Sequence, residues 1–261
     1  MKVTNLGRMK FGAAKNMAFD EAMRRMAEFN SKIYMRFYEF EIESVILSVS
    51  DDPSCIKPNC SVDLTRRNTG GKPIYIDGNA LAYSIAGPIA QIEGGTGPNA
   101  VHKTFGKIAE GAIEEIVGNR AEVGLGGVYS ININGMPVAG HAQNIDLSRS
   151  FLYHGVIAVG KWDADRIRNA IEFPEKDYES ISALPALSDY TGIGVEDSKK
   201  ILIEGMLRRA EAEDPDEEER AEVNRISDEL MKEKYSDKAW IYGEGRQLRR
   251  GARFCLLYPD A

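Results

Sequence analysis

The stretch of sequence that decides the fold runs from residue 66 to residue 77 and reads Arg66-Arg67-Asn68-Thr69-Gly70-Gly71-Lys72-Pro73-Ile74-Tyr75-Ile76-Asp77. Two adjacent arginines precede a pair of glycines, and a run with the composition of a β-strand follows them. Two fixed cations beside a main chain without side chains suit an anion that is brought close to the backbone. Taken alone, the same string also fits a surface arginine pair followed by a turn.

The composition and charge of the whole chain are those of an ordinary globular protein. The 261 residues are 43% hydrophobic, which is enough for one large core rather than several small domains. The formal net charge of -7 argues against a nucleic-acid or anionic-membrane partner, and no apolar run reaches membrane-spanning length. The first ten residues lack the apolar core of a signal peptide, so we expect a cytoplasmic protein.

The cysteines and histidines do not form the pattern of a metal site. Cys55, Cys60 and Cys255 are too few for a disulfide framework and fit a reducing compartment. Their spacing matches no zinc signature, and the sequence has only 3 histidines. We therefore expect no metal-ligating residues, and the sequence leaves the role of the cysteines open.

Hydrophobic periodicity predicts a mixed sheet with helices packed on it. Apolar residues at helical spacing predict helices over residues 16–29, 98–117 and 195–209, and Gly118 follows the second as a C-cap. Strands are expected over residues 31–49 and 153–159. The dipeptide Asn134-Gly135 predicts a type I′ turn within a hairpin over residues 128–143. Asp163 is expected to cap a short helix that ends near Ile171.

The acidic run over residues 210–222 is the main shift in composition. We expect a helix there, with Asp214 as its N-cap and Pro215 in its first turn, where no donor is needed. Residues 213–261 are therefore expected to form a C-terminal helix and tail of a single domain over residues 1–261. The basic residues 246–253 and the apolar end fit a final edge strand better than a partner contact.

The opening stretch resembles the RRxTGGGAVYHD signature of lipoate–protein ligases and the related octanoyl transferases. Further matches follow in the family's order over nearly the whole chain: Asn16–Ala22, Arg36–Tyr38, Gly78–Ile85, Ala139–Gln143, His154–Ile157 and Lys234–Trp240. Several separate matches in order are more specific than one glycine motif. The resemblance implies a divergent member of the biotin/lipoate ligase superfamily, with an α+β fold of mixed, mainly antiparallel sheets packed with helices.

The resemblance also implies a reaction and a set of site residues. Such ligases couple lipoate or octanoate to ATP, with Mg, and pass the acyl group from the adenylate to a lysine of a lipoyl carrier domain. Arg67 would face the acyl phosphate and act in catalysis. Too few residues follow Lys234 for a small accessory domain, so a separate accessory subunit is expected. The expected ligand-binding residues are Arg66, Arg67, Gly70, Gly71, Lys72, Tyr75, Asp77, Tyr83, Gly140, Ala142, Gln143, His154 and Gly155; tight sheet packing explains Gly140, Ala142 and Gly155 nearly as well.

Four positions depart from the ligase pattern. The hairpin lysine that is catalytically important in ligases falls on Pro137, and Tyr129-Ser130 stands where those enzymes have an Asn-Asp pair. Ile76 replaces the histidine of the signature. Loss of one preorganised charge-stabilising donor costs about 10²–10³-fold in rate. Two interpretations therefore remain: a ligase, or a catalytically altered or inactive relative that binds an acyl ligand or an acyl-carrier partner.

Lys72 and two cysteines offer alternative chemistry. Lys72 precedes Pro73, which favours extended dihedrals, so its ammonium group can act as a relocated catalytic cation or lie in solvent. The octanoyl transferases use a cysteine nucleophile, but its place falls near Glu122. The resemblance implies a tunnel for the acyl chain. A thioester mechanism through Cys55 or Cys60 would require their proline-bearing loop to cover this tunnel.

Overall fold

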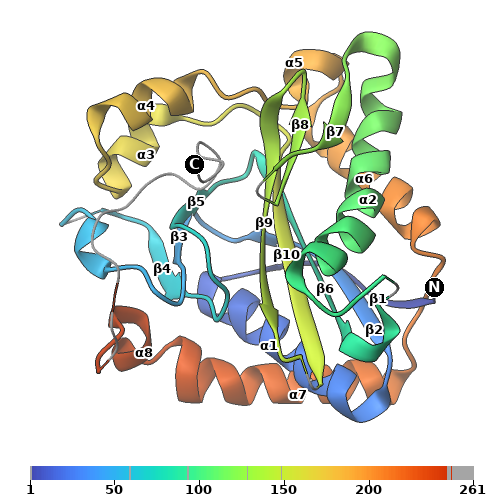
Figure 1. Ribbon diagram of the computed structural model, residues 1–261. Coiled ribbons are helices and arrows are strands. Elements are labelled where there is room, and N and C mark those ends of the chain that lie inside the picture. The colour runs from blue at the N-terminus through green and yellow to red at the C-terminus, as the bar shows by residue number, and fades with distance from the viewer. Residues whose placement is uncertain are drawn as a thin grey trace.

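The computed structural model describes residues 2–58, 60–92, 94–127, 129–147, 149–245 and 248 (Figure 1). Within these residues the strands are β1 (Val3–Phe11), β2 (Ile33–Phe40), β3 (Ser44–Leu47), β4 (Asp63–Arg66), β5 (Ile74–Ile76), β6 (Ala80–Pro88), β7 (Val123–Leu125), β8 (Ser130–Ile133), β9 (Met136–Ile145), β10 (Ser150–Ala158) and β11 (Ala212–Glu213). The α-helices are α1 (Ala13–Asn30), α2 (Pro98–Val117), α3 (Ala164–Ala170), α4 (Glu175–Ser182), α5 (Ser188–Thr191), α6 (Val195–Arg209), α7 (Glu217–Leu230) and α8 (Lys238–Tyr242).

The strands form two sheets. The large sheet has the order β11-β1-β2-β6-β10-β9-β8-β7, and the small sheet has the order β4-β3-β5. Strand β1 pairs in parallel with β11 and β2, and β3 pairs in parallel with β4, whereas the other pairings are antiparallel. The expected α+β fold with mixed, mainly antiparallel sheets is confirmed.

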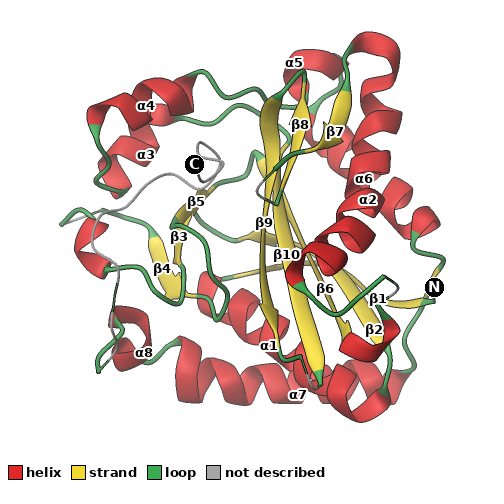
Figure 2. Ribbon diagram, in the orientation of Figure 1, coloured by secondary structure: helices red, strands yellow, loops and turns green. Residues whose placement is uncertain are grey.

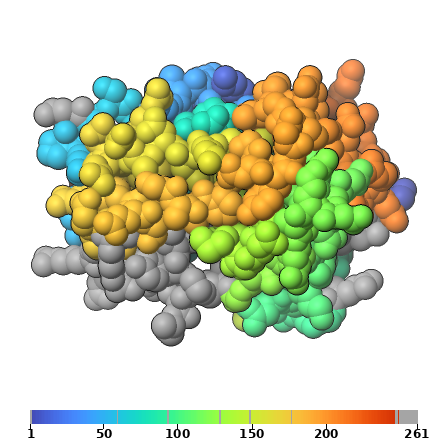
Figure 3. All heavy atoms as spheres, turned by 90° about the horizontal axis from the view of Figure 1, so that it is seen from above, coloured from blue at the N-terminus to red at the C-terminus, as the bar shows by residue number. Residues whose placement is uncertain are grey.

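Helices and the small sheet cover the two faces of the large sheet (Figure 2). Along β10, Phe151 and Tyr153 pack in one core with α2 and α6, whereas Leu152 and Val156 pack in a second core with α1 and the small sheet. This division follows from the alternation of side chains along a strand. Helix α7 lies along α1. Seen from above, the segment that carries α3 to α5 forms a surface band beside α6 (Figure 3). The space between the two sheets holds the candidate site.

Most local expectations from the sequence are confirmed. Helix α6 spans the predicted residues 195–209, and Gly118 ends α2 with a φ of 60°. Asn134 and Gly135 have φ values of 49° and 79°, as a type I′ turn requires. The second strand of that hairpin, β9, extends to Ile145. Asp163 caps α3 by accepting from two main-chain N–H groups. None of the described helices is long and apolar enough to span a membrane.

The start of α7 corrects one expectation. Its N-cap is Asp216, not Asp214, because Asp216 accepts from Glu219 N at 2.7 Å and the Glu219 carboxylate accepts from Asp216 N. This reciprocal capping box outweighs the advantage of Pro215 in the first turn. Residues 246–253 and the apolar end were expected to form a strand; apart from Leu248, they lie outside the described residues.

Candidate functional site

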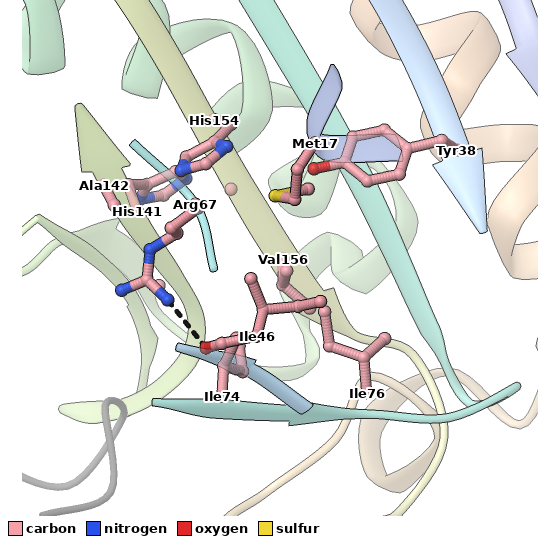
Figure 4. A pocket seen from close by; sticks show the side chains of 12 residues that line it. Met17, Tyr38, Ile46, Arg67, Ile74, Ile76, His141, Ala142, His154 and Val156 are labelled. Carbon is pink, nitrogen blue, oxygen red and sulfur yellow. Dashed lines mark hydrogen bonds between the residues drawn. The ribbon is translucent and has the colours of Figure 1, made fainter. Parts of the chain in front are cut away.

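A small cavity of about 40 Å³, here called the slot, lies between the two sheets beside α1 (Figure 4). The large sheet contributes β2, β9 and β10, and the small sheet contributes β3 and β5. Its lining is predominantly apolar, which suits a hydrocarbon chain with a few polar groups at one end. The residues that line it are Met17, Tyr38, Ile46, Arg67, Ile74, Ile76, Gly140, His141, Ala142, His154, Gly155 and Val156.

The wall on the large sheet is built from small residues on paired strands. Gly140 lies opposite Val156, and Ala142 lies opposite His154. A Cβ atom on Gly155 would lie 2.8 Å from His141 Nε2, closer than real Cβ contacts come. Gly155 therefore lines the slot and also meets a tight packing requirement.

Arg67 lines the slot and shapes the glycine loop. Its guanidinium group donates to Gly70 O at 2.7 Å, to Lys72 O at 2.7 Å and to Ile46 O at 3.0 Å (Figure 4). Gly71 has a φ of 98°, which favours glycine. Gly70, Gly71 and the half-buried Lys72 do not line the slot. They form the turn that Arg67 closes.

Arg66 has a different role from its neighbour. Its Nη1 donates to Ser48 O at 2.5 Å, and its Nε donates to Trp240 O at 3.1 Å and Ile241 O at 3.0 Å. The indole of Trp240 donates back to Arg66 O at 2.7 Å. Successive residues of an extended chain point to opposite sides. The expectation that both arginines border the slot is therefore met by Arg67 alone, and Arg66 ties α8 to β4.

A buried polar chain behind the slot joins five of the sequence motifs. Arg36 donates to Asp20 Oδ1 from Nη2 at 2.5 Å and from Nε at 3.1 Å, and Ser84 also donates to this oxygen. His154 Nδ1 lies 2.8 Å from Asp20 Oδ2, and His154 Nε2 lies 2.7 Å from Thr69 Oγ1. Burial raises the pKa of Asp20, but Arg36 and His154 outweigh it and hold this pKa below its usual value. Asp20, Arg36 and Thr69 were not among the expected site residues.

A second polar chain lies on the α2 side of the large sheet. His141 Nδ1 donates to Tyr129 O at 2.8 Å, and His141 Nε2 accepts from Tyr83 Oη at 2.5 Å. His102 Nδ1 lies 2.8 Å from Tyr153 Oη. Burial lowers the pKa of His141 to about 3, so this imidazole is neutral at physiological pH. Tyr83 thus lies behind His141 rather than in the slot, and no sequence pattern predicted the contact between His102 and Tyr153.

The remaining expected site residues lie outside the slot. Gln143 Nε2 donates to Pro98 O at the start of α2. Tyr75 Oη donates to Glu43 Oε2 at 2.7 Å, and Asp77 Oδ1 accepts from Asn79 N at 2.8 Å, so both residues serve the turns around β5. Of the four departing positions, Ile76 lines the slot, whereas Tyr129, Ser130 and Pro137 do not.

The cysteine loop does not supply a reactive thiol at the slot. Neither Cys55 nor Cys60 lines it, and burial raises the pKa of Cys55 to about 12. Cys255 lies outside the described residues. Among the side chains that the structure describes, no group of three or more His, Cys, Asp or Glu residues could hold a metal ion.

Comparisons with known proteins identify the family and the structural relatives of this chain. The sequence model of the family described as "Lipoyl protein ligase A/B catalytic domain" matches residues 12–207. A structure from a study of "a bi-partite lipoate protein ligase and its E2 lipoyl domain" of Thermoplasma acidophilum has 20% identity and a TM-score of 0.74, covering 94% of this chain and 98% of that one. Lipoate-protein ligase A bound with ATP has 19% identity and a TM-score of 0.74, covering 93% and 99%.

A third solved structure, LipL1 of P. falciparum in complex with lipoate, has 14% identity and a TM-score of 0.69, covering 94% of this chain and 76% of that one. No curated protein matches the sequence. The structural likenesses establish the fold, while the family match spans well over half of the sequence. The chain belongs to the family that carries the lipoyl protein ligase A/B catalytic domain.

Proposed function

We propose that this protein binds lipoate or octanoate in the slot and transfers the acyl group to a lysine of a lipoyl carrier domain. The observation that carries the proposal is the slot itself, in which the apolar side chains Ile46, Ile74 and Ile76 face the small residues of β9 and β10. These residues offer the apolar surface that a thin hydrocarbon chain requires, the surrounding side chains must move apart to admit it, and Arg67 brings one positive charge to the slot. The relatives with lipoate and with an E2 lipoyl domain support this substrate class.

ATP and Mg fit the described residues less well than the acyl chain does. Pro137 lies on β9 opposite Asn132. By the sequence resemblance, this proline takes the place of the lysine that ligases use in catalysis. An imino ring offers no charge and no donor to a phosphate group. The guanidinium of Arg67 donates to three backbone carbonyls, which holds it in place beside the slot. We therefore expect acid activation by ATP to be slow, by about 10²–10³-fold relative to a site with a preorganised donor.

Three measurements on the same protein preparation test the proposal together. Titration calorimetry measures octanoate and lipoate binding, pyrophosphate release measures activation with ATP, and mass spectrometry of a lipoyl domain measures transfer. We expect binding, weak pyrophosphate release and detectable modification of the carrier lysine. Absence of both binding and transfer would contradict the proposal.

The substitution Pro137→Lys tests the cause of slow activation. A lysine at this position adds a cation to β9, the strand whose Gly140 and Ala142 line the slot, so pyrophosphate release should rise by up to about 10²-fold. Met136→Lys is the matched control, because Met136 is exposed at the hairpin turn and a lysine there points to the other side of β9. Equal effects of the two variants would show that the hairpin register does not place residue 137 at the reacting phosphate.

A second candidate function is favoured by the same proline. A relative without activation chemistry could hold the acyl group, or an acyl carrier, as a binding partner. Octanoate binding without pyrophosphate release and without transfer, from ATP or from an activated donor, would favour it. A separate accessory subunit is a further proposed partner, since the relative from Thermoplasma acidophilum is bipartite. Activity of the chain alone would remove the need for it.

A further inference from the structure

A hydroxyl group that the proposed function does not use lies next to the slot. Thr69 stands between Arg67 and the glycine pair, and its Oγ1 lies 2.7 Å from His154 Nε2. His154 Nδ1 in turn lies 2.8 Å from Asp20 Oδ2. A hydroxyl, an imidazole and a buried carboxylate in this order form the arrangement that activates a nucleophile in acyl transfer.

The carboxylate determines the direction of these hydrogen bonds. Arg36 and Ser84 donate to Asp20 Oδ1, so the carboxylate is an acceptor and His154 Nδ1–H donates to its second oxygen. In the neutral imidazole, Nε2 then carries a lone pair, and the Thr69 hydroxyl donates to it. The proton that a nucleophile must lose is already directed at a base.

The position of this triad suits an acyl substrate. His154 and Arg67 both line the slot, so the base and one positive charge face the space proposed for the acyl chain. Thr69 is only 1% exposed, and an acyl carbonyl would have to reach its Oγ1 from the slot, away from bulk water. The Arg67 guanidinium can stabilise the oxyanion that forms when a hydroxyl attacks a carbonyl.

Other nucleophiles are poorly placed. The chain has Pro137 in place of the family's lysine, and neither described cysteine lines the slot. We propose that Thr69 is an acyl-accepting nucleophile that takes the acyl group from an activated donor, a thioester or an acyl phosphate anhydride, and holds it as an ester. This inference rests on the proposed function, because it places the acyl group in the same slot.

The two half-reactions balance without a further reagent. Thr69 Oγ1 attacks the acyl carbonyl and forms a C–O bond, its proton passes to His154 Nε2, and the bond to the leaving thiolate or phosphate breaks. The imidazolium returns this proton to a leaving thiolate, or to solvent when phosphate leaves. A carrier lysine then attacks the ester through its neutral amine and gives a proton to His154. The amide forms as Thr69 Oγ1 leaves and recovers its proton.

The test is acylation of the full-length protein by two probes, octanoyl-coenzyme A and octanoyl-adenylate, followed by intact mass measurement and peptide mapping. We expect one octanoyl group on the peptide that contains Thr69. Its ester should resist neutral hydroxylamine, which cleaves thioesters. Thr69→Ser should retain the adduct, Thr69→Val should lose it, and His154→Gln should slow its formation by about 10²–10⁴-fold. The two probes distinguish a thioester donor from an anhydride donor.

The outcomes separate this inference from the proposed function. Wild-type protein that binds octanoate and modifies the carrier, yet shows no adduct on Thr69 with either probe, would overturn the inference and leave the proposed function standing. An adduct on Cys55 or Cys60, removed by neutral hydroxylamine, would also overturn it. The wild-type peptide map decides the matter even where Thr69→Val does not fold. Failure of octanoate binding would overturn both.

Discussion

Gly155 leaves room for two aromatic rings, His141 and Tyr83, that a side chain at this position would displace. A Cβ atom there would lie 2.8 Å from His141 Nε2 and 3.0 Å from Tyr83 Cε1. Both rings are held by the hydrogen bond between Tyr83 and His141, so neither can move without breaking it. The absence of a side chain at this position is therefore part of how the slot wall is built.

The substitution Gly155→Ala should destabilise the protein by about 1–3 kcal/mol, the usual cost of overpacking a core. Urea unfolding monitored by circular dichroism measures this change. Gly78→Ala is the matched control, because nothing lies within 4 Å of its added methyl group; its effect should stay within about 0.5 kcal/mol. Equal stability of the two variants would contradict the packing described for β10.

The two adjacent arginines show what the sequence could not predict at this scale. Arg66 and Arg67 are the same type of residue, and which one faces the slot depends on how β4 packs in the fold. Arg66 accepts a hydrogen bond from Trp240, and Arg67 donates to the main chain of Ile46; both contacts form only when distant parts of the chain come together. The contact between Thr69 and His154 is likewise invisible before the fold is known, because 85 residues separate them.

At the scale of elements, local patterns predicted helices and the hairpin well. The range of α6 and the Asn134-Gly135 turn follow from interactions between residues a few positions apart. The start of α7 was predicted wrongly, because two acidic residues flank Pro215 and both can cap a helix. The choice of Asp216 depends on Glu219, which completes the capping box three residues later.

The two aspartates give a direct test of this cap. Asp216→Ala removes the acceptor for Glu219 N and should cost about 1 kcal/mol of stability. Asp214→Ala is the control, since Asp214 is exposed and lies before the cap, and its effect should be within about 0.5 kcal/mol. Thermal or urea unfolding of both variants measures the difference. A larger loss for Asp214→Ala would place the start of α7 elsewhere.

Helix α1 is joined to the segment after α7 through Glu21. Its Oε2 accepts from Lys234 Nζ at 2.5 Å and from Tyr235 Oη at 2.7 Å. Burial alone would raise the pKa of Glu21, but Lys234, Tyr235 and Arg25 outweigh it and lower this pKa from 4.5 to about 2. The Lys234–Trp240 motif therefore serves to dock the C-terminal helices.

This shift in pKa predicts a pH dependence of stability. Between pH 4.5 and pH 2 the unfolded chain binds a proton at Glu21 that the folded protein does not. The contribution, about 3 kcal/mol, is thus complete well above pH 4.5 and lost as the pH falls toward 2. Glu21→Gln should flatten the fall in unfolding free energy across this range, measured by urea titrations at several pH values. A slope as steep as that of the wild type would rule out this assignment.

At the scale of the whole molecule, the separated motifs meet in one place. Asp20, Arg36, Thr69 and His154 come from four segments and form one buried chain of hydrogen bonds that ends on the glycine loop. The motifs and their order therefore predicted the family and the fold, because each motif supplies a side chain that hydrogen-bonds to a residue of another motif. The sequence could not predict which side chains border the slot, since that depends on how two sheets pack.

The most direct test of the whole account is a crystal structure of the protein grown with octanoate. The account predicts the hydrocarbon chain in the slot, between Ile46 and Ala142, with its carboxyl group on the side of Arg67 and His154. An octanoate bound only at another surface, with the slot closed by the surrounding side chains, would contradict it.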